Sequence, residues 1–176
     1  MTNIPTGIAT LFDNPDDPDR TFHALMPVLT RELGCHRCLL FLREPRLQWS
    51  ICAHGWWDRP EHGFARDKSW RRQPANLPEI DPMFAEALRN PAALFIDDIE
   101  TAGPAVLNLE YERRDFGHRA LIHAPIYHGG LCYGVLEPCS IDRPQVWTAR
   151  DRGLIAWLQR RLGPLAAAYV AANAPK

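Results

Sequence analysis

Histidine and cysteine side chains gather in one short stretch of the sequence, "GHRALIHAPIYHGGLCYGVL", residues 117–136. Imidazoles bind metals and haem iron and transfer protons near neutral pH, while thiols bind soft metals or take part in redox chemistry. The stretch contains His118, His123, His128 and Cys132. Two apolar runs flank a polar turn at 128–130, so the pattern predicts a β-hairpin. What each side chain can do then depends on the face of the sheet that it occupies.

His123 is the histidine most suited to a site. Alternation along the strand places it with Leu121 on one face and places the small residues Ala120 and Ala124, with Ile122, on the other, where a helix can pack closely. We therefore expect His123 on the face that loops cover, where a buried imidazole needs a hydrogen-bond partner. His118 and His128 lie at the strand start and the turn tip, and there we expect exposure to solvent.

The segment 55–82 is long, aromatic and rich in proline, with Trp56, Trp57 and Trp70 among its residues. Long loops in compact domains are often functional lids. Flat aromatic rings suit a planar ligand, but they equally suit a small satellite core beneath a loop. The sequence leaves these two interpretations open.

Two cysteine motifs also invite a chemical interpretation. Cys35 and Cys38 form a C-x-x-C, and Cys52 and His54 share a strand face by alternation. A zinc site needs about four ligands, and the chain has no second C-x-x-C. We therefore expect these thiols to pack in the core as small hydrophobes, and we predict no metal site.

Composition places the chain among ordinary globular domains. It has 176 residues, 46% of them hydrophobic and 23% charged, with a net charge of −1. This balance predicts one domain with no bulk attraction to nucleic acid or to an anionic membrane. No apolar run reaches the length of a membrane span and no secretory signal is evident, so we expect a cytoplasmic protein with five reduced cysteines.

The remaining elements follow from apolar periodicity and capping residues. Asp17-Pro18 predicts a helix start, with apolar residues at helical spacing up to a stop at Gly34. Strands are predicted at 38–43, 47–53 and 93–96, a short helix at 83–88 capped by Asp81, and a last helix from the capping box at Thr148. Residues 1–16 are expected to be an irregular lead. Hairpin-linked strands between terminal helices predict an α+β fold with an antiparallel sheet and helices on one face.

Four segments, in order, resemble the GAF domain family. They are "LGCHRCLLFLREP", "DPMFAEALRNPAALFIDDIE", "GHRALIHAPIYHGGLCYGVLEP" and "RPQVWTARDRGLIAWL". The resemblance implies a single GAF domain over residues 17–172, followed by a tail at 173–176. It also implies a six-stranded antiparallel sheet, with terminal helices on one face that often pair with a second copy. Long loops would close over the other face and enclose a pocket for a small molecule.

Within this family, the chain resembles the GAF domains of cyanobacterial and bilin-binding photoreceptors, yet it departs from them at two positions. Asn108-Leu109 stands where that group carries a Cys-His pair, and Cys139 stands where a second bilin-contacting histidine falls. We therefore expect no covalent bilin, and the ligand stays unidentified. The position of Cys139 implies that its strand face lines the pocket. The candidate ligand-binding residues are His123, Tyr133, Glu137, Cys139, Trp56, Trp57 and Trp70.

Three functions follow as hypotheses. The first is a small-molecule-binding sensory domain without catalytic residues or its own output domain, since the sequence has no nucleophile-elbow, phosphate-loop or metalloprotease motif. It would signal through a homodimer or a partner protein bound to the terminal helices. The second is a redox, haem or tetrapyrrole protein that uses its cysteines or His123. The third is a structural interaction module whose pocket is filled by its own side chains.

Overall fold

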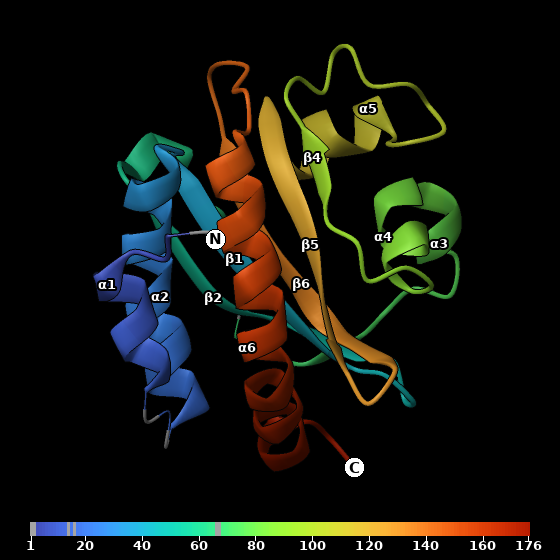
Figure 1. The fold of residues 1–176 in the computed structure, drawn as a ribbon. Coiled ribbons are helices and arrows are strands. Elements are labelled where there is room, and N and C mark those ends of the chain that lie inside the picture. Colours follow the sequence, from blue (N-terminus) through green and yellow to red (C-terminus); the bar gives the residue numbers. More distant parts are fainter. Residues whose placement is uncertain (1–2, 14, 16, 66–67) are drawn as a thin grey trace.

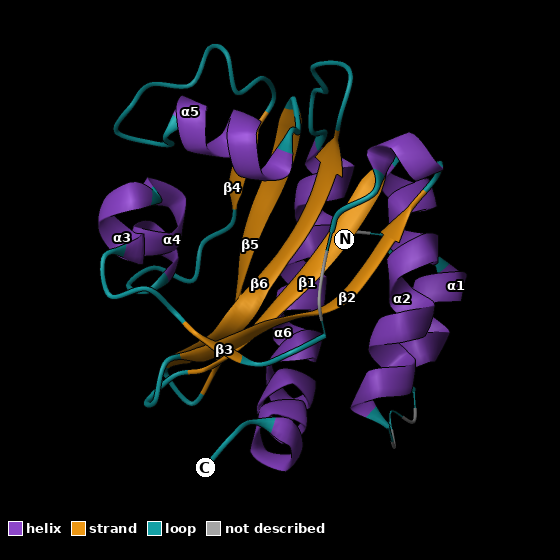
Figure 2. Ribbon diagram, turned by 180° about the vertical axis from the view of Figure 1, so that it is seen from behind, coloured by secondary structure: helices purple, strands orange, loops and turns teal. Residues whose placement is uncertain are grey.

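A computed structural model describes residues 3–13, 15, 17–65 and 68–176 as an α+β fold, which confirms the predicted class. Its six-stranded antiparallel sheet has the order β3-β2-β1-β6-β5-β4. The strands are β1 Arg37–Glu44, β2 Trp49–Trp57, β3 Arg71–Arg72, β4 Leu94–Ile96, β5 Ala120–His128 and β6 Leu131–Ser140. The long helices α2 and α6 cover one face, and shorter helices lie over the other (Figures 1 and 2).

The two long helices begin and end as their capping residues predict. Helix α2, Pro18–Leu33, starts at Asp17, whose carboxylate accepts from two backbone N–H groups of the first turn. It stops at Gly34, which has a left-handed φ of 63° that a residue without Cβ adopts easily. Helix α6, Ala149–Asn173, starts with the predicted capping box between Thr148 and Asp151.

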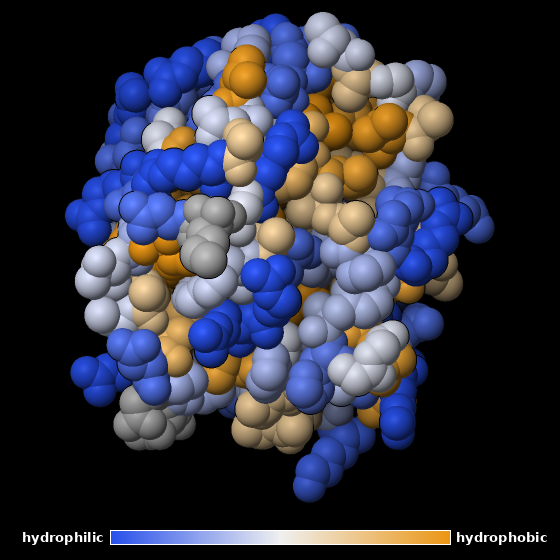
Figure 3. Space-filling model, viewed as in Figure 1, coloured by the Kyte–Doolittle hydropathy of each residue, from blue (hydrophilic) through white to orange (hydrophobic). Residues whose placement is uncertain are grey.

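The main hydrophobic core lies between the sheet and these two helices. Helix α2 contributes Phe22 and Leu25, helix α6 contributes Leu158, and strand β5 contributes Ile122 and Ala124. The small residues of β5 thus face the helices, as predicted. Along the outer surface of this layer, polar and apolar side chains are mixed, and apolar atoms gather near β4 and α5 (Figure 3).

The opposite face carries the shorter elements. They are α3 Leu77–Ile80, α4 Pro82–Ala87, α5 Leu109–Tyr111 and η3 Glu112–Phe116, whereas η2 Pro60–His62 lies at the end of the sheet beside α2 (Figure 1). Helix α4 begins at Asp81, as predicted, because the carboxylate of Asp81 accepts from the backbone N–H of Phe84. Among the described residues, none of the helices is both long and apolar enough to cross a bilayer.

Three features differ from the sequence-based expectations. The lead contains α1 Thr6–Ala9 and η1 Thr10–Phe12, because Ile8 and Phe12 are buried in the main core. Residues 1, 2, 14 and 16 of that lead lie outside the described residues. Strand β2 continues to Trp57, so Trp56 and Trp57 belong to the sheet and not to a loop.

The third difference concerns Cys52 and His54, which do not share a face. The register between β1 and β2 shifts at Leu40/Phe41, so that Cys52 pairs with Phe41 and His54 pairs with Leu40. One inserted residue moves every later side chain to the other face. The ligand set that strict alternation allowed is therefore not formed.

Candidate functional site

A cavity of about 200 Å³ lies between the sheet and the short helices of the covered face. The sheet lines it with Phe41, Leu42, Arg43, Ser50, His123, Gly134, Val135 and Glu137, and the covering elements line it with Gln73, Leu77, Asp81, Phe84, Tyr111 and Phe116. Figure 2 shows the helices α3, α4 and α5 in front of the sheet, on the side away from α6. The predicted hollow face is therefore present, and both His123 and Glu137 line it.

His123 lies in the middle of β5, opposite Leu94 of β4. Its side chain is buried, and its Nδ1 atom has no hydrogen-bond partner among the described residues. Burial, with a smaller effect of the neighbouring His118, lowers the pKa of His123 to about 3, so the ring is neutral at physiological pH. A neutral imidazole at a cavity wall can exchange a hydrogen bond with a ligand.

Glu137, His118 and Glu112 form a buried chain of titratable groups beside the cavity. His118 Nε2 lies 2.8 Å from Glu112 Oε2, and His118 Nδ1 lies 3.7 Å from Glu137 Oε1. Glu112 Oε1 and Glu137 Oε1 have no hydrogen-bond partner among the described residues. His118 is only 2% exposed, so the expectation of solvent exposure is wrong. The five-residue turn η3 folds back over the start of β5 and brings Glu112 against the ring.

Burial holds these carboxyl groups close to neutrality. It raises the pKa of Glu112 to about 8 and that of Glu137 to about 7. Burial also lowers the pKa of His118 to about 4, against a smaller opposing effect of Glu137. Two carboxyl groups with a pKa near physiological pH beside one cavity are typical of a functional site.

The polar groups at the other end of the cavity are already engaged. Asp81 caps α4, and burial raises its pKa. Arg43 donates to the Gln73 side chain at 3.1 Å and to the Cys132 carbonyl at 3.2 Å. Among the described lining residues, Glu137 and His123 each have a fully buried polar atom without a hydrogen-bond partner.

An aromatic cluster forms one wall of the cavity and extends beyond it. Phe116 stacks on Phe64, with ring centroids 5.7 Å apart, and on His118 at 5.5 Å. Phe41 and Tyr111 meet Phe116 edge to face. Sequence reasoning missed this cluster. The alternation of β1 could have found Phe41, since Leu40 and Leu42 on either side of it face the main core.

The other candidate residues do not line the cavity. Cys139 is buried in a second hydrophobic cluster with Met83 and Leu121. Burial raises the pKa of its thiol to about 12. Tyr133 packs against the main core instead. The register between β5 and β6 shifts at Ile126/Tyr127, which breaks the alternation that placed Tyr133 beside Glu137.

The tryptophans do not line the cavity. Trp56 and Trp70 are half-buried and pack against the main core, and Trp57 is half-buried at the end of β2. A role of Trp56, Trp57, Trp70, Tyr133 or Cys139 in ligand binding stays a prediction. Cys38 is fully buried in the main core, where a small hydrophobe was expected.

Comparisons with known proteins agree with this architecture. The family model described as "GAF domain" matches residues 17–163. The phycocyanobilin-bound GAF domain of a cyanobacterial phytochrome superimposes with a TM-score of 0.71 at 14% identity, covering 96% of this chain and 94% of that one. The third GAF domain of a Synechocystis protein, in its photoproduct state, gives a TM-score of 0.63 at 23% identity over 89% and 98%.

A GAF domain from a different kind of protein gives a TM-score between these two values. The one from an Acinetobacter phosphoenolpyruvate-protein phosphotransferase gives a TM-score of 0.67 at 11% identity, with 94% of this chain and 91% of that one covered. A comparison with curated proteins gave no match. The structural likeness, at these identities, shows the fold alone. Because the family model spans most of the sequence, the chain belongs to the GAF domain family.

Proposed function

We propose that this GAF domain is a sensory domain that binds a compact small molecule in the cavity beside His123 and Glu137. One observation carries the proposal: His123 Nδ1 and Glu137 Oε1 are buried without a hydrogen-bond partner among the described residues, and both residues line the same cavity. Buried polar atoms are almost always hydrogen-bonded, so such atoms at a cavity wall favour a ligand or ordered water between them.

The cavity limits the size of the ligand. Its volume of about 200 Å³ is below the range of about 300–1,000 Å³ that is usual for drug-sized ligands. A molecule of one or two rings fits this volume. Phe116 and Phe41 offer aromatic contacts to a flat ring, and Glu137 favours an N–H group or a cation.

Binding would be passed to the terminal helices through β5. His123 faces the cavity, whereas its neighbours Ile122 and Ala124 pack in the core against α2 and α6. A ligand that favours one position of β5 therefore shifts the population of helix positions on the other side. A second copy or a partner protein on those helices would receive the change, and sedimentation equilibrium with and without ligand tests this.

A thermal-shift screen of the full chain tests the ligand proposal. Compact nitrogen heterocycles and aromatic amines form the panel, and hits are measured by calorimetry on wild type and on Glu137→Gln. We expect the substitution to weaken binding about tenfold or more, since a charge-assisted hydrogen bond contributes roughly 1.5–3 kcal/mol. Glu79→Gln, at an exposed position, is the matched control and should bind as wild type. A panel without hits, or equal binding by Glu137→Gln, would overturn the proposal.

A tetrapyrrole is the second candidate ligand, because bilin-bound GAF domains are among the similar structures. The cavity is too small for a four-ring molecule, so α3 and α4 would have to move outward. The Asn108 side chain connects these covering elements by donating to the Ile80 carbonyl at 3.1 Å and capping α5. We expect no visible absorption band in protein produced with haem or biliverdin present. A stable band would favour this candidate instead.

A further inference from the structure

A second group of chemically able side chains lies at one end of the sheet, outside the cavity. His36 directly precedes β1, His62 ends η2, and Asp142 lies in the loop between β6 and α6. One possible ligand atom from each residue lies within 4.8 Å of the other two. We propose that His36, His62 and Asp142 form a binding site for one divalent transition-metal ion of the zinc type.

Both imidazoles are held with one ring nitrogen engaged. His62 Nδ1 lies 2.6 Å from the Asp58 carboxylate, and His36 Nδ1 accepts from the backbone N–H of Ile141 at 3.0 Å. This leaves Nε2 of His62 as an atom that a metal can bind. At His36 a metal would bind Nδ1, which lies 3.4 Å from Asp142 Oδ1, and would take the place of the Ile141 N–H. The contact of His62 with Asp58 is typical of metal-binding histidines, which donate their other ring N–H to a carboxylate, a backbone carbonyl or water.

The two rings lie close enough to share an ion after a small rearrangement. They stack with centroids 4.6 Å apart and an angle of 29° between their planes. Nitrogen lone pairs lie in the ring plane, so one ring must tilt before both can point at one ion. Zinc bonds of about 2.0–2.2 Å place neighbouring ligand atoms roughly 3.3 Å apart, so atoms that now lie up to 4.8 Å from one another must approach by as much as about 1.5 Å.

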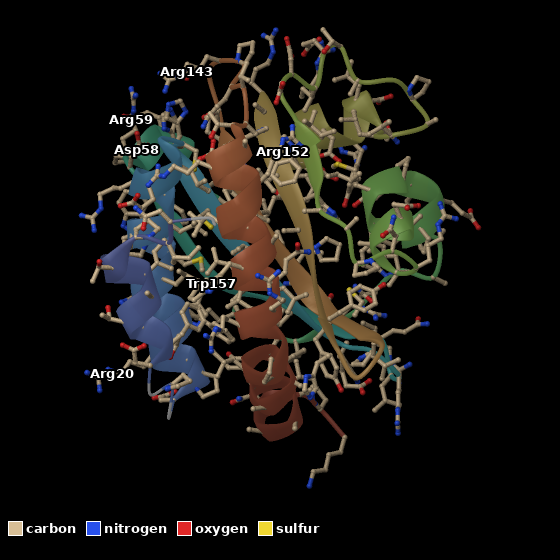
Figure 4. The ribbon with its side chains drawn as sticks, in the orientation of Figure 1. Arg20, Asp58, Arg59, Arg143, Arg152 and Trp157 are labelled. Atoms are coloured by element: carbon tan, nitrogen blue, oxygen red, sulfur yellow. The ribbon has the colours of Figure 1, made fainter. Side chains whose placement is uncertain are left out.

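The third ligand and the nearby charges allow this rearrangement. Asp142 Oδ1 lies 3.4 Å from His36 Nδ1, and the side chain is half exposed, so its carboxylate can turn toward the ion. Asp58 brings a second negative charge. Arg59 and Arg143 bring positive charges, and both arginines are exposed at the outer corner of the fold (Figure 4). Two imidazoles and one carboxylate are a common zinc ligand set, with one position left for water.

A metal ion at this site would attach the start of the segment that covers the cavity to the end of the sheet. The His62 carbonyl accepts from Arg37 at 3.5 Å, and Arg37 also donates to the Phe116 carbonyl at 2.8 Å. Phe64, two residues after His62, stacks on Phe116. A metal ion would therefore fix His62 against the sheet edge and restrain the aromatic cluster beside the cavity.

Calorimetry with Zn²⁺ on the tag-free full chain, after treatment with a chelator, tests the site. We expect one ion per chain, and a tenfold or larger loss of affinity in both His62→Gln and Asp142→Asn. His128→Gln changes an exposed histidine of the β5–β6 turn and should bind as wild type. Asp58→Asn should weaken binding by about 10–100-fold, as outer-shell substitutions do.

Spectroscopy with Co²⁺ identifies the ligands. We expect the visible bands of a nitrogen- and oxygen-bound ion without near-ultraviolet thiolate bands, because no cysteine belongs to the site. A thiolate band, no saturable binding, or unchanged affinity in both substituted chains would overturn the proposal. Asp142 lies in an exposed loop, so Asp142→Asn keeps the test valid if His62→Gln fails to fold.

Discussion

The carboxyl group of Glu137 combines two properties that ordinary core residues lack. It is 4% exposed and lies between the cavity and His118, whose Nδ1 is 3.7 Å from Glu137 Oε1, yet this oxygen has no hydrogen-bond partner among the described residues. An unpartnered buried carboxylate is destabilising, and its pKa rises toward physiological pH as a result. A ligand that donates to this oxygen would compensate this destabilisation, and binding would then depend on pH.

The raised pKa of Glu137 predicts a pH-dependent stability with a definite sign. The folded pKa is about 7 against an ordinary value of 4.5, so the native state keeps a proton that the unfolded chain has released between these pH values. The contribution of this group to the unfolding free energy therefore falls as pH rises through that window. Glu137→Gln removes the effect, and at pH ~8 it should be more stable than wild type by about 2–3 kcal/mol.

Urea unfolding at both ends of the window measures this difference. At pH ~5 the wild-type carboxyl is protonated, so both proteins should agree within about 1 kcal/mol. The exposed Glu79→Gln should follow wild type at both pH values. A Glu137→Gln curve parallel to that of wild type across the window would contradict the assigned environment of Glu137.

At this scale the sequence predicted part of the site. Alternation placed His123 on the covered face, because side-chain direction is a local property of a strand. For Glu137, alternation gave only that it shares a face with Cys139, and the family resemblance implied that this face lines the pocket. The burial of His118 was not predicted, because its partner Glu112 reaches it only through the fold of η3. The apolar periodicity of the sequence does not predict a five-residue turn of this kind. Tyr133 was misplaced because a register shift changes the face without a clear mark in the sequence.

Among the elements, the contact between α6 and the end of β5 connects the two faces of the sheet. Gly163 of α6 lies so close to β5 that an added Cβ would be 2.3 Å from the Tyr127 carbonyl oxygen. The Tyr127 hydroxyl donates to the Ala87 carbonyl of α4 at 2.8 Å. One residue of β5 therefore contacts both the helix layer and an element that covers the cavity.

Gly163→Ala should destabilise the protein, although the same change in an exposed helix stabilises it. The new methyl group forces α6 away from Tyr127, and overpacking of this kind costs about 1–3 kcal/mol. Chemical denaturation measures the loss, with Ala156→Gly at an exposed position of α6 reporting helix propensity alone, about 1 kcal/mol. An unchanged or raised stability of Gly163→Ala would show that α6 does not pack this closely.

The helices and strands were predicted well where capping residues and turn glycines determine their ends. Both long helices begin at their capping residues, and the hairpin forms around its glycine turn. The covering segment was predicted only as a loop. It contains η2, β3 and α3, which depend on contacts with distant parts of the chain. The extension of β2 to Trp57 likewise depends on pairing with β1 and not on strand propensity.

For the whole molecule, the proposed ligand binding would be coupled to folding. A ligand that binds only the native state raises the unfolding free energy by about 2.7 kcal/mol at 100 times its Kd. For a chain of this size, that should raise Tm by roughly 5–10 °C. Differential scanning calorimetry checks the value. A shift that stays the same when Glu137 is replaced by Gln would place binding elsewhere on the molecule.

The most direct test of the central claim is a crystal structure of the protein soaked with the strongest hit of the screen. If the ligand binds in the cavity, we expect ligand density between the sheet and α4. A donor atom of the ligand should lie within hydrogen-bonding distance of Glu137 Oε1, and a polar atom should lie near His123 Nδ1. Density at another surface, with the space beside these two residues filled by side chains, would contradict it.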